Sequence, residues 1–586
     1  MTRALVAVAS GRRPADLVVR NGRWVNVLSG EILPGTDVAV LGDRIAYCGP
    51  DAGPMIGPGT VVVEARGRYL VPGLLDAHVH IESSMLTVTG FARAVLPRGT
   101  TGVFADPHEI ANVLGLRGIR LFLNEARRVP LRVYLQVPSC VPSAPGLETP
   151  GAELGPEEVE KALSWPGVVG LGEVMDYPGV VRGEREVHAK IAAALRLGKT
   201  VGGHYASPDL GLPFHAYAAA GPADCHEGTR VEDAVARVRQ GMRAILRQGT
   251  AWRDLREGLR AVTELGLDPR HVLLATDDRH AETLLREGHM DDVVRKAIAA
   301  GIPPVKAIQL ATLNTAEHFR VDRDVGAIAP GRLADLLVVS DLQQFTVELV
   351  VAGGEVVAEG GELRVELPPF PYPAWAMGTV RLARPLRGED FALPAPVAEG
   401  EVEVRAIEVV ADQAPTRERR VRLPVQEGRV ELRPGVAYVA VVERHRGSGR
   451  IGKGFIVGLG LQEGCAVAST VAHDSHHLLV VGTDLDAMAL GANRVAAAGG
   501  GIAAVAGGEV RAFLALPIAG ILSDRPAEEV AAGMDAAAQA LARCGSTLPH
   551  AVMTLSLLAL PVIPALRVTD RGLVDVERGE LISPFV

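Results

Sequence analysis

The sequence lacks the cysteine spacings of disulfide-bonded and zinc-ribbon proteins. Its 586 residues include only five cysteines, which are scattered, odd in number and nowhere spaced as Cys-x-x-Cys. This usage argues against a disulfide framework and against a structural zinc module. It fits a reducing compartment, so we expect a cytoplasmic protein.

Dense basic runs and long apolar runs are also missing. Sixty Lys and Arg residues against 69 Asp and Glu give a net charge of -9. No Lys/Arg cluster is present that could follow a phosphate backbone, so nucleic acid is not an expected partner. No uninterrupted apolar stretch reaches the roughly 18 residues of a membrane span; the apolar segment 551–566 is broken by two prolines. The apolar start of the chain is too short and too poorly flanked for export.

The composition that remains is that of a well-buried globular protein, with 48% hydrophobic and 22% charged residues. Short apolar alternations separated by Gly-containing turns occupy 17–66 and return at 326–365, which indicates small β-hairpins. Between them, short apolar segments alternate with longer helical periodicity. We predict a small composite β-sandwich domain (1–68 with 325–384), a (β/α)8 TIM-like barrel (69–324) and a C-terminal α/β domain (385–586).

The barrel prediction rests on eight apolar segments within about 240 residues, the size and rhythm of that fold. The segments are 69–80, 100–109, 131–140, 168–175, 200–206, 222–228, 243–251 and 271–280. Nearly all of them end in polar or ionisable residues. Because strand C-termini converge on one mouth in this fold, we expect those side chains to meet.

Six of these strand-end residues form a candidate metal site. Taken singly, each also fits a structural role, such as a satisfied histidine pair or a buried ion pair. Four histidines and two carboxylates from five strands at one rim are instead the nitrogen and oxygen ligands that suit a pair of Zn, Mn or Fe ions. The six are His78, His80, Glu173, His204, His226 and Asp277.

The chemistry of a two-metal site follows from these residue types. Glu173 has two oxygens and can bridge two ions, and a hydroxide shared between the ions would be nucleophilic near neutral pH. Asp277 can hold that hydroxide and take its proton.

Longer motifs give a specific resemblance. The segments 72–80 and 326–339 are similar to the amidohydrolase superfamily. Within it, finer matches from about residue 15 to 525 closely resemble the bacterial adenine deaminase family. These matches are His80-Ile81-Glu82-Ser83-Ser84-Met85, Asp106-Pro107-His108-Glu109, Ser139-Cys140-Val141-Pro142, Cys225-His226-Glu227, Thr276-Asp277-Asp278 and Ser469-Thr470-Val471-Ala472-His473-Asp474-Ser475-His476.

The resemblance implies hydrolysis of adenine to hypoxanthine and ammonia at a binuclear centre of manganese, iron or zinc. His78 and His80 would bind one ion, His204 and His226 the other, and Glu173 would bridge them. Asp277 would be the ligand of the eighth strand and the catalytic base. The implied partner is a small purine base, and a homo-oligomer is expected only as typical of large barrels.

Protonation of N1 during the attack on C6 requires an acid, and the sequence leaves three candidates. The candidates for this acid are Glu82, Glu109 and Glu227. We prefer Glu227 because it follows a proposed ligand. Glu82 and Glu109 also fit helix capping or pairing with an arginine.

The sequence also leaves other functions open. The alternatives are an amidohydrolase acting on another aminopurine or cyclic amide, and a non-catalytic barrel scaffold. Glu173 stands where related cyclic-amide hydrolases carry a carbamylated lysine, which weighs against that substrate class. The cluster His473-Asp474-Ser475-His476-His477 has no assigned role, although it could cap the substrate pocket from the second domain.

Overall fold

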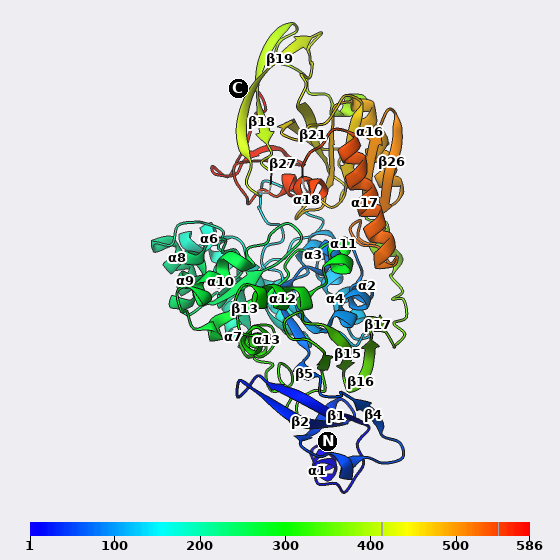
Figure 1. Cartoon of the computed structure of the whole chain (residues 1–586). Coiled ribbons are helices and arrows are strands. Elements are labelled where there is room, and N and C mark those ends of the chain that lie inside the picture. The colour runs from blue at the N-terminus through cyan, green and yellow to red at the C-terminus, as the bar shows by residue number, and fades with distance from the viewer. Residues whose placement is uncertain (412–413, 549) are drawn as a thin grey trace.

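The computed structural model describes residues 1–411, 414–548 and 550–586. Three regions follow one another along the long axis of the molecule (Figure 1). The N-terminal strands lie at one end, the central region in the middle and the C-terminal region at the other end. Among the described residues, no helix combines the length and apolarity needed to cross a membrane.

The N-terminal region is one nine-stranded sheet built from two distant parts of the chain. Parallel pairing of β1 with β5 and antiparallel pairing of β5 with β14 join the two parts. The strands are β1 (Leu17–Asn26), β2 (Glu31–Leu41), β3 (Arg44–Gly49), β4 (Val61–Glu64), β5 (Tyr69–Pro72), β14 (Leu336–Val339), β15 (Val347–Ala352), β16 (Glu355–Glu359) and β17 (Glu362–Leu363). The returning segment thus extends the same hydrogen-bond ladder, and the composite β-domain is built from both predicted parts of the chain. The short helix α1 (Thr2–Ala9) packs against β2 and β3 of this sheet.

The central region contains eight parallel strands in chain order, one inside each predicted segment. They are β6 (Leu74–Val79), β7 (Thr100–Ala105), β8 (Arg132–Val137), β9 (Val168–Val174), β10 (Thr200–Gly203), β11 (Asp224–Cys225), β12 (Arg243–Arg247) and β13 (Val272–Ala275). β6 to β10 form one sheet and β11 to β13 another. Ala223 N donates to Val201 O at 2.8 Å, and Asp277 N donates to His78 O at 3.0 Å. These bonds connect the two sheets at both junctions, so the parallel sheet is curled.

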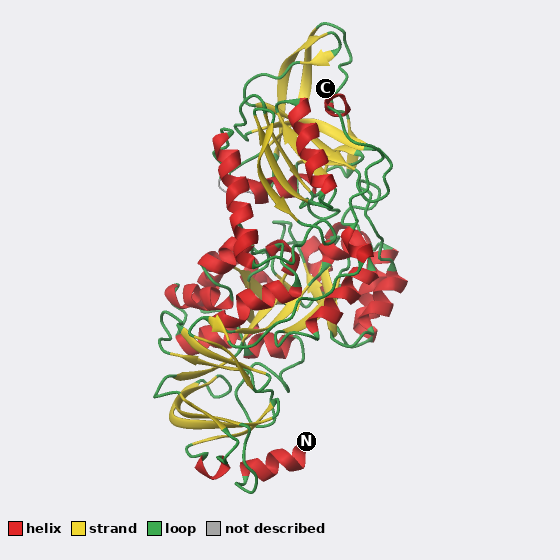
Figure 2. Ribbon diagram, turned by 90° about the vertical axis from the view of Figure 1, so that its right-hand side faces the viewer, coloured by secondary structure: helices red, strands yellow, loops and turns green. Residues whose placement is uncertain are grey.

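Helices cover the outside of this curled sheet (Figure 2). Their apolar faces are buried; in α10, for example, Leu255 and Leu259 are buried while Arg260 is exposed. The main helices are α2 (Val88–Val95), α3 (His108–Leu114), α4 (Leu116–Ala126), α5 (Pro156–Leu163), α6 (Tyr177–Arg182), α7 (Arg185–Arg196), α8 (Leu212–Ala219), α9 (Val231–Arg239), α10 (Leu255–Thr263), α11 (Ala281–Arg286), α12 (Met290–Ala299), α13 (Pro304–Leu310) and α14 (Leu313–His318). Covered on both faces, the strands are apolar along almost their whole length.

The first predicted strand, 69–80, divides at Gly73. Its first part is β5 of the N-terminal sheet and its second part is β6 of the central sheet. A Cβ atom at Gly73 would lie 2.0 Å from Thr101 Oγ1, so only glycine allows the chain to pass this close to β7.

The described residues of the C-terminal region form a nine-stranded sheet, a three-stranded sheet and three α-helices. In the large sheet all pairings are antiparallel except β18 with β22, so helices and strands do not alternate as in a doubly wound fold. Its strands are β18 (Gly400–Glu408), β19 (Arg417–Gln426), β20 (Arg429–Val430), β21 (Val436–Val442), β22 (Ile451–Val457), β23 (Cys465–Ser469), β24 (Leu478–Gly482), β25 (Gly501–Ala506) and β26 (Glu509–Ala515). The small sheet and the helices are β27 (Leu566–Thr569), β28 (Gly572–Asp575), β29 (Glu580–Ile582), α16 (Leu485–Ala497), α17 (Ala527–Arg543) and α18 (Ala551–Ser556).

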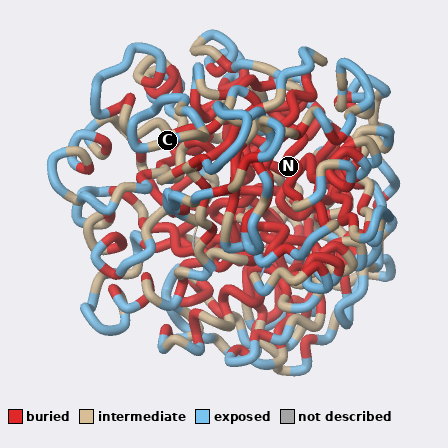
Figure 3. Tube along the Cα trace, turned by 90° about the horizontal axis from the view of Figure 1, so that it is seen from above, coloured by how far each residue is buried: buried red, intermediate tan, exposed pale blue. Residues whose placement is uncertain are grey.

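The central and C-terminal regions share a core. One cluster of buried apolar residues runs from Val71 and Leu86 in the central part to Ile518 and Leu566 in the C-terminal part. Helix α17 packs against α11, where Arg286 pairs with Asp535. Seen from above, buried chain fills the middle of the molecule and exposed loops surround it (Figure 3). Continuous packing of this kind fixes one region against the other.

Candidate metal centre and active site

The six predicted ligand residues come together at one rim of the central sheet. Each stands at or just after the carboxyl end of a strand, where parallel strands present side chains to a common mouth. Five of them are buried and His204 is partly exposed. The six are His78, His80, Glu173, His204, His226 and Asp277.

Glu173 lies between two pairs of histidines and turns one oxygen toward each pair. Its Oε1 is 2.8 Å from His80 Nε2 and 3.4 Å from His78 Nε2. Its Oε2 is 3.3 Å from His226 Nε2 and also contacts His204 Nδ1. A carboxylate placed in this way can serve two adjacent cations, one through each oxygen.

Asp277 also divides its two oxygens between different partners. Oδ1 is 3.3 Å from His80 Nε2 and 3.6 Å from His78 Nε2, whereas Oδ2 accepts a hydrogen bond of 2.9 Å from Arg247 Nη1. The backbone of Asp277 has φ 58°, a conformation that costs a non-glycine residue on the order of 1–3 kcal/mol and is concentrated at functional sites.

The surroundings favour the ionised form of both carboxylates. Burial acts to raise the pKa of Glu173, but the nearby imidazoles, led by His80, outweigh it and hold the pKa well below its usual range. Burial also acts to raise the pKa of Asp277, and the hydrogen bond with His80 and the charge of Arg247 together bring it well below the usual range. Both groups are therefore anionic at neutral pH, the form that binds a cation.

The donor set fits divalent cations. In the part of the chain that the structure describes, His78, Glu173 and His226 offer one ligand atom each within 4.8 Å of one another, and so do His78, His80 and Asp277. Glu173 Oε1 is buried, and despite its contact with His80 Nε2 at 2.8 Å it accepts no well-aligned hydrogen bond. A buried anionic oxygen without a donor is costly unless a cation lies beside it. Imidazole and carboxylate ligands suit Zn²⁺, Mn²⁺ and Fe²⁺.

A cavity of about 690 Å³ opens onto these ligands. Its central wall includes His80, Glu173 and Asp277, and its opposite wall comes from the C-terminal region. The C-terminal lining consists of His473, Asp474 and mainly apolar residues: Ala414, Pro415, Leu557, Leu560, Val562, Ile563 and Pro564. Ligand sites of roughly this size commonly lie between domains and combine apolar walls with a few polar groups.

Arg247 is a site residue that sequence analysis missed. It is the last residue of β12 and is buried. Besides Asp277 it contacts Glu227 Oε1 at 2.5 Å and Asp254 Oδ2 at 3.0 Å. The sequence could have identified Arg247, because a charged residue at the end of an apolar strand is the same pattern that identified Glu173.

Glu227, the preferred proton donor on sequence grounds, is a paired carboxylate in the structure. Burial acts to raise its pKa, but Arg247, with help from His204 and His226, brings the pKa to about 2. A group that is ionised at neutral pH is poorly suited to act as an acid. The geometry therefore does not favour that role for Glu227.

Glu109 and Glu82 occupy different environments. Glu109 lines the cavity, and neither of its carboxylate oxygens has a hydrogen-bond partner. Burial, with Glu82 nearby, raises the pKa of Glu109 well above its usual range against the opposing effect of His108. Glu82 is not among the cavity residues, and its Oε1 accepts from Ile110 N at 3.2 Å in the first turn of α3. Glu82 thus has the capping role that sequence analysis left open, and Glu109 is the better placed acid.

Contacts between regions bring further polar residues to the cavity. His108 Nε2 lies 3.5 Å from Asp474 Oδ1, and His473 Nδ1 lies 3.7 Å from Glu109 Oε1. The sequence shows that these residues are polar but not that they meet, because the contact depends on how the two regions pack.

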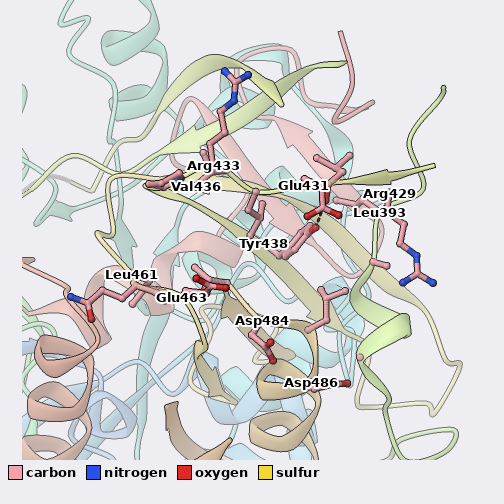
Figure 4. A pocket seen from close by; sticks show the side chains of 18 of the residues that line it. Leu393, Arg429, Glu431, Arg433, Val436, Tyr438, Leu461, Glu463, Asp484 and Asp486 are labelled. Carbon is pink, nitrogen blue, oxygen red and sulfur yellow. Dashed lines mark hydrogen bonds between the residues drawn. The ribbon is translucent and has the colours of Figure 1, made fainter. Parts of the chain in front are cut away.

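A second cavity, of about 1130 Å³, lies within the C-terminal region (Figure 4). Its charged residues, among them Arg433, Glu463 and Asp486, come from separate elements and surround an open hollow. Tyr438 donates its hydroxyl to Val430 O at 2.6 Å. None of the six proposed ligands lines this cavity.

Comparison with known proteins agrees with the geometry of the site. The amidohydrolase family matches residues 69–357, and the adenine deaminase C-terminal domain matches residues 413–580. A protein of Mesorhizobium japonicum named adenine deaminase is 55% identical over 100% of this chain and 97% of its own length. Similar proteins of that name come from Rhizobium meliloti (adenine deaminase 3; 56% identity, 99% of this chain and 98% of the relative) and Rubrobacter xylanophilus (56%, 98% and 96%). The chain belongs to the adenine deaminase family.

Membership in the adenine deaminase family confirms the resemblance inferred from the motifs. Both family matches cover residues of the site: the amidohydrolase match includes all six proposed ligands, and the adenine deaminase C-terminal match includes His473 and Asp474. The cavity shared by the two regions therefore combines residues from both matched parts of the chain.

Proposed function

We propose that the protein hydrolyses adenine to hypoxanthine and ammonia at a centre of two divalent metal ions. The observation that carries the proposal is the position of Glu173, with one oxygen toward each of two histidine pairs. The names of the full-length relatives support adenine as the substrate. The curled sheet of eight parallel strands supports reading the central region as a (β/α)8 barrel, with the site at the carboxyl ends of its strands.

The ligand roles follow from the two sides of Glu173. His78, His80 and Asp277 would hold one ion, and His204 and His226 the other. Manganese and iron are the proposed metals, with zinc as the alternative, since all three accept this donor set. When bound, the two ions would lower the pKa of a shared water toward neutrality and so supply a nucleophilic oxygen.

The remaining steps belong to side chains of this protein. Asp277 Oδ1 faces the centre and would receive the proton of the attacking oxygen, while Arg247 holds the other oxygen of Asp277 in place. Glu109, whose pKa is held well above its usual range by burial, would protonate N1 as the C6–O bond forms. Asp277 would then pass its proton to the amino group. Cleavage of the C6–N bond releases ammonia and leaves hypoxanthine.

Ammonia release tests the proposed function. The protein is stripped of metal by a chelator, reloaded with Mn²⁺, and assayed with adenine, guanine, adenosine and hydantoin. We expect two equivalents of metal and rapid release of ammonia from adenine alone. Glu173→Gln keeps the shape of the side chain but removes its charge, so it should lose metal and activity together. Metal-loaded protein that releases no ammonia from adenine, or that acts equally on adenosine, would contradict the proposal.

A further inference from the structure

The segment Ala472–His477 reaches the active-site cavity from the C-terminal region. It connects β23 with β24, and all of its residues are buried. His473 and Asp474 line the same cavity as Glu109 and Glu173. Two polar side chains of the second region therefore form part of the wall opposite the proposed metal centre.

Hydrogen bonds hold this segment from both sides. Arg444 donates to His476 O, and it also donates to Thr379 Oγ1 at 2.9 Å and to Ala519 O at 3.0 Å. His445 Nε2 lies 2.7 Å from Ser475 O.

From the central region, Glu148 accepts a hydrogen bond from the Ser475 hydroxyl. Glu148 is itself held by Ser143 Oγ at 2.8 Å and Ala144 N at 2.9 Å. The segment is thus fixed before any ligand binds, which reduces the entropy lost on recognition.

Each of the two cavity residues keeps one unpartnered atom. His473 Nε2 and Asp474 Oδ2 are buried and have no hydrogen-bond partner, although the residues are 5% and 2% exposed. Native proteins leave few buried polar groups unpaired, so such atoms on residues that line a cavity indicate a polar ligand. His473 offers a nitrogen that can donate a hydrogen bond. The next residue, Asp474, offers an oxygen that, in the ionised form, only accepts hydrogen bonds.

The imidazole ring of His108 lies between Asp474 and the proposed metal centre. Its Nδ1 is 3.5 Å from Glu173 Oε1, and its Nε2 is 3.5 Å from Asp474 Oδ1. One imidazole ring therefore spans from the bridging carboxylate to the C-terminal carboxylate. A purine is longer by one fused ring, so a base bound at the metal centre is long enough to contact His473 and Asp474.

We infer that His473 and Asp474 read the five-membered-ring edge of the free purine base, a role that rests on the proposed function. Asp474 Oδ2 accepts the N9–H group, and His473 Nε2–H donates to a ring nitrogen beside it. A nucleoside carries ribose in place of the N9 hydrogen, so it leaves Asp474 without a donor and introduces bulk against the buried segment. The C-terminal region thereby selects the base over its nucleoside.

A cation is the other occupant to consider, because His108, His473 and Asp474 also form a possible three-ligand group. A cation held by all three side chains would take one atom from each residue, whereas a donor and an acceptor side by side on a base match the unpartnered His473 Nε2 and Asp474 Oδ2. The base satisfies those two atoms, and for that reason we assign the pair to the base.

The test compares adenine with 9-methyladenine, in which a methyl group replaces the N9 hydrogen. In the Mn²⁺-loaded wild type we expect kcat/KM for adenine to exceed that for 9-methyladenine by roughly 100-fold or more, as for sites built around a substrate N–H. Asp474→Ala should reduce this ratio below about tenfold. Asp474→Asn should keep part of it, because an amide oxygen still accepts. Asp486→Ala, in the second cavity, is the matched control and should leave the ratio unchanged.

Each outcome decides the assignment. A wild type that prefers neither substrate overturns it, whether or not the variants fold. So does an Asp474→Ala protein that is folded by circular dichroism and keeps the full ratio. A third equivalent of metal in the wild type that Asp474→Ala lacks would give the pair to a cation. If the wild type releases no ammonia from adenine at all, the proposed function itself fails.

Discussion

Individual residues in the site differ chiefly in whether a buried charge has a partner. Arg247 serves Glu227, Asp254 and Asp277 together, so these carboxylates have a cation beside them. Glu109 is 1% exposed, and its neighbours within 4 Å are imidazoles of His80, His108 and His473 instead of a guanidinium. Desolvation disfavours an unpaired buried anion, whereas a neighbouring guanidinium stabilises one. Two glutamates on the same cavity are thereby suited to opposite tasks.

The two glutamates can be separated by matched substitutions. Glu109→Gln should lower kcat for adenine roughly 100- to 10,000-fold, the range for loss of a positioned acid. Glu227→Gln should have an effect at least about tenfold smaller, since its role is to pair with Arg247. Steady-state kinetics on Mn²⁺-loaded protein measure both, with metal content as the control. A larger loss for Glu227→Gln would restore it as the proton donor.

At the scale of elements, short connections after strands carry the chemistry and the rest of the chain positions them. The segment between β23 and β24 illustrates this, because its backbone carbonyls are bound by Arg444 and His445. Arg444 is fully buried and donates only to neutral oxygens. A buried guanidinium used in this way orients a loop and does not take part in the reaction.

Removing this positioning residue should act on substrate binding. Arg444→Ala leaves three buried acceptors without a donor, which should lower the free energy of unfolding by about 3 kcal/mol. It should also raise KM for adenine roughly tenfold, and added guanidinium ions should partly restore KM. Urea titration and kinetics measure the two effects, with Arg446→Ala, an exposed neighbour, as the control. A loss of stability with an unchanged KM would show that Arg444 does not position the site.

At the scale of the whole molecule, the cavity exists only because two regions share one core. Ligands separated by about 200 residues, from His78 to Asp277, meet at the rim of the central sheet, and the C-terminal region closes the opposite wall. Cations bound here would hold five strand ends together. Binding that is specific to the folded state adds directly to stability.

Metal removal should therefore destabilise the protein. At a metal concentration 100 times the Kd, one site contributes about 2.7 kcal/mol, so chelation should lower Tm by several degrees in differential scanning calorimetry. Readdition of Mn²⁺ should restore Tm, and His226→Asn should reduce the size of the shift. An unchanged Tm after complete removal of metal would argue against a cation centre formed by these six residues.

Much of the central region was predictable from local patterns. An apolar run that ends in His or a carboxylate indicates a buried strand whose end faces a shared mouth, and this rule located β6, β9 and β13 with their ligands. It failed where the decision was not local. The break at Gly73 depends on the approach of Thr101 from another strand. The pairing of β5 with β14, which joins the two parts of the composite β-domain, likewise depends on segments far apart in the chain.

The sequence by itself determined which strand ends carry the proposed ligands and which residue types a cation would meet there, because periodicity and side-chain chemistry are properties of short segments. Tertiary structure alone decided the pairing of Arg247 with Glu227, the burial of Glu109 among histidines and the entry of His473 and Asp474 into the cavity. These outcomes depend on distances between segments far apart in the chain. Charge pairing and desolvation act through space, so no local pattern encodes them.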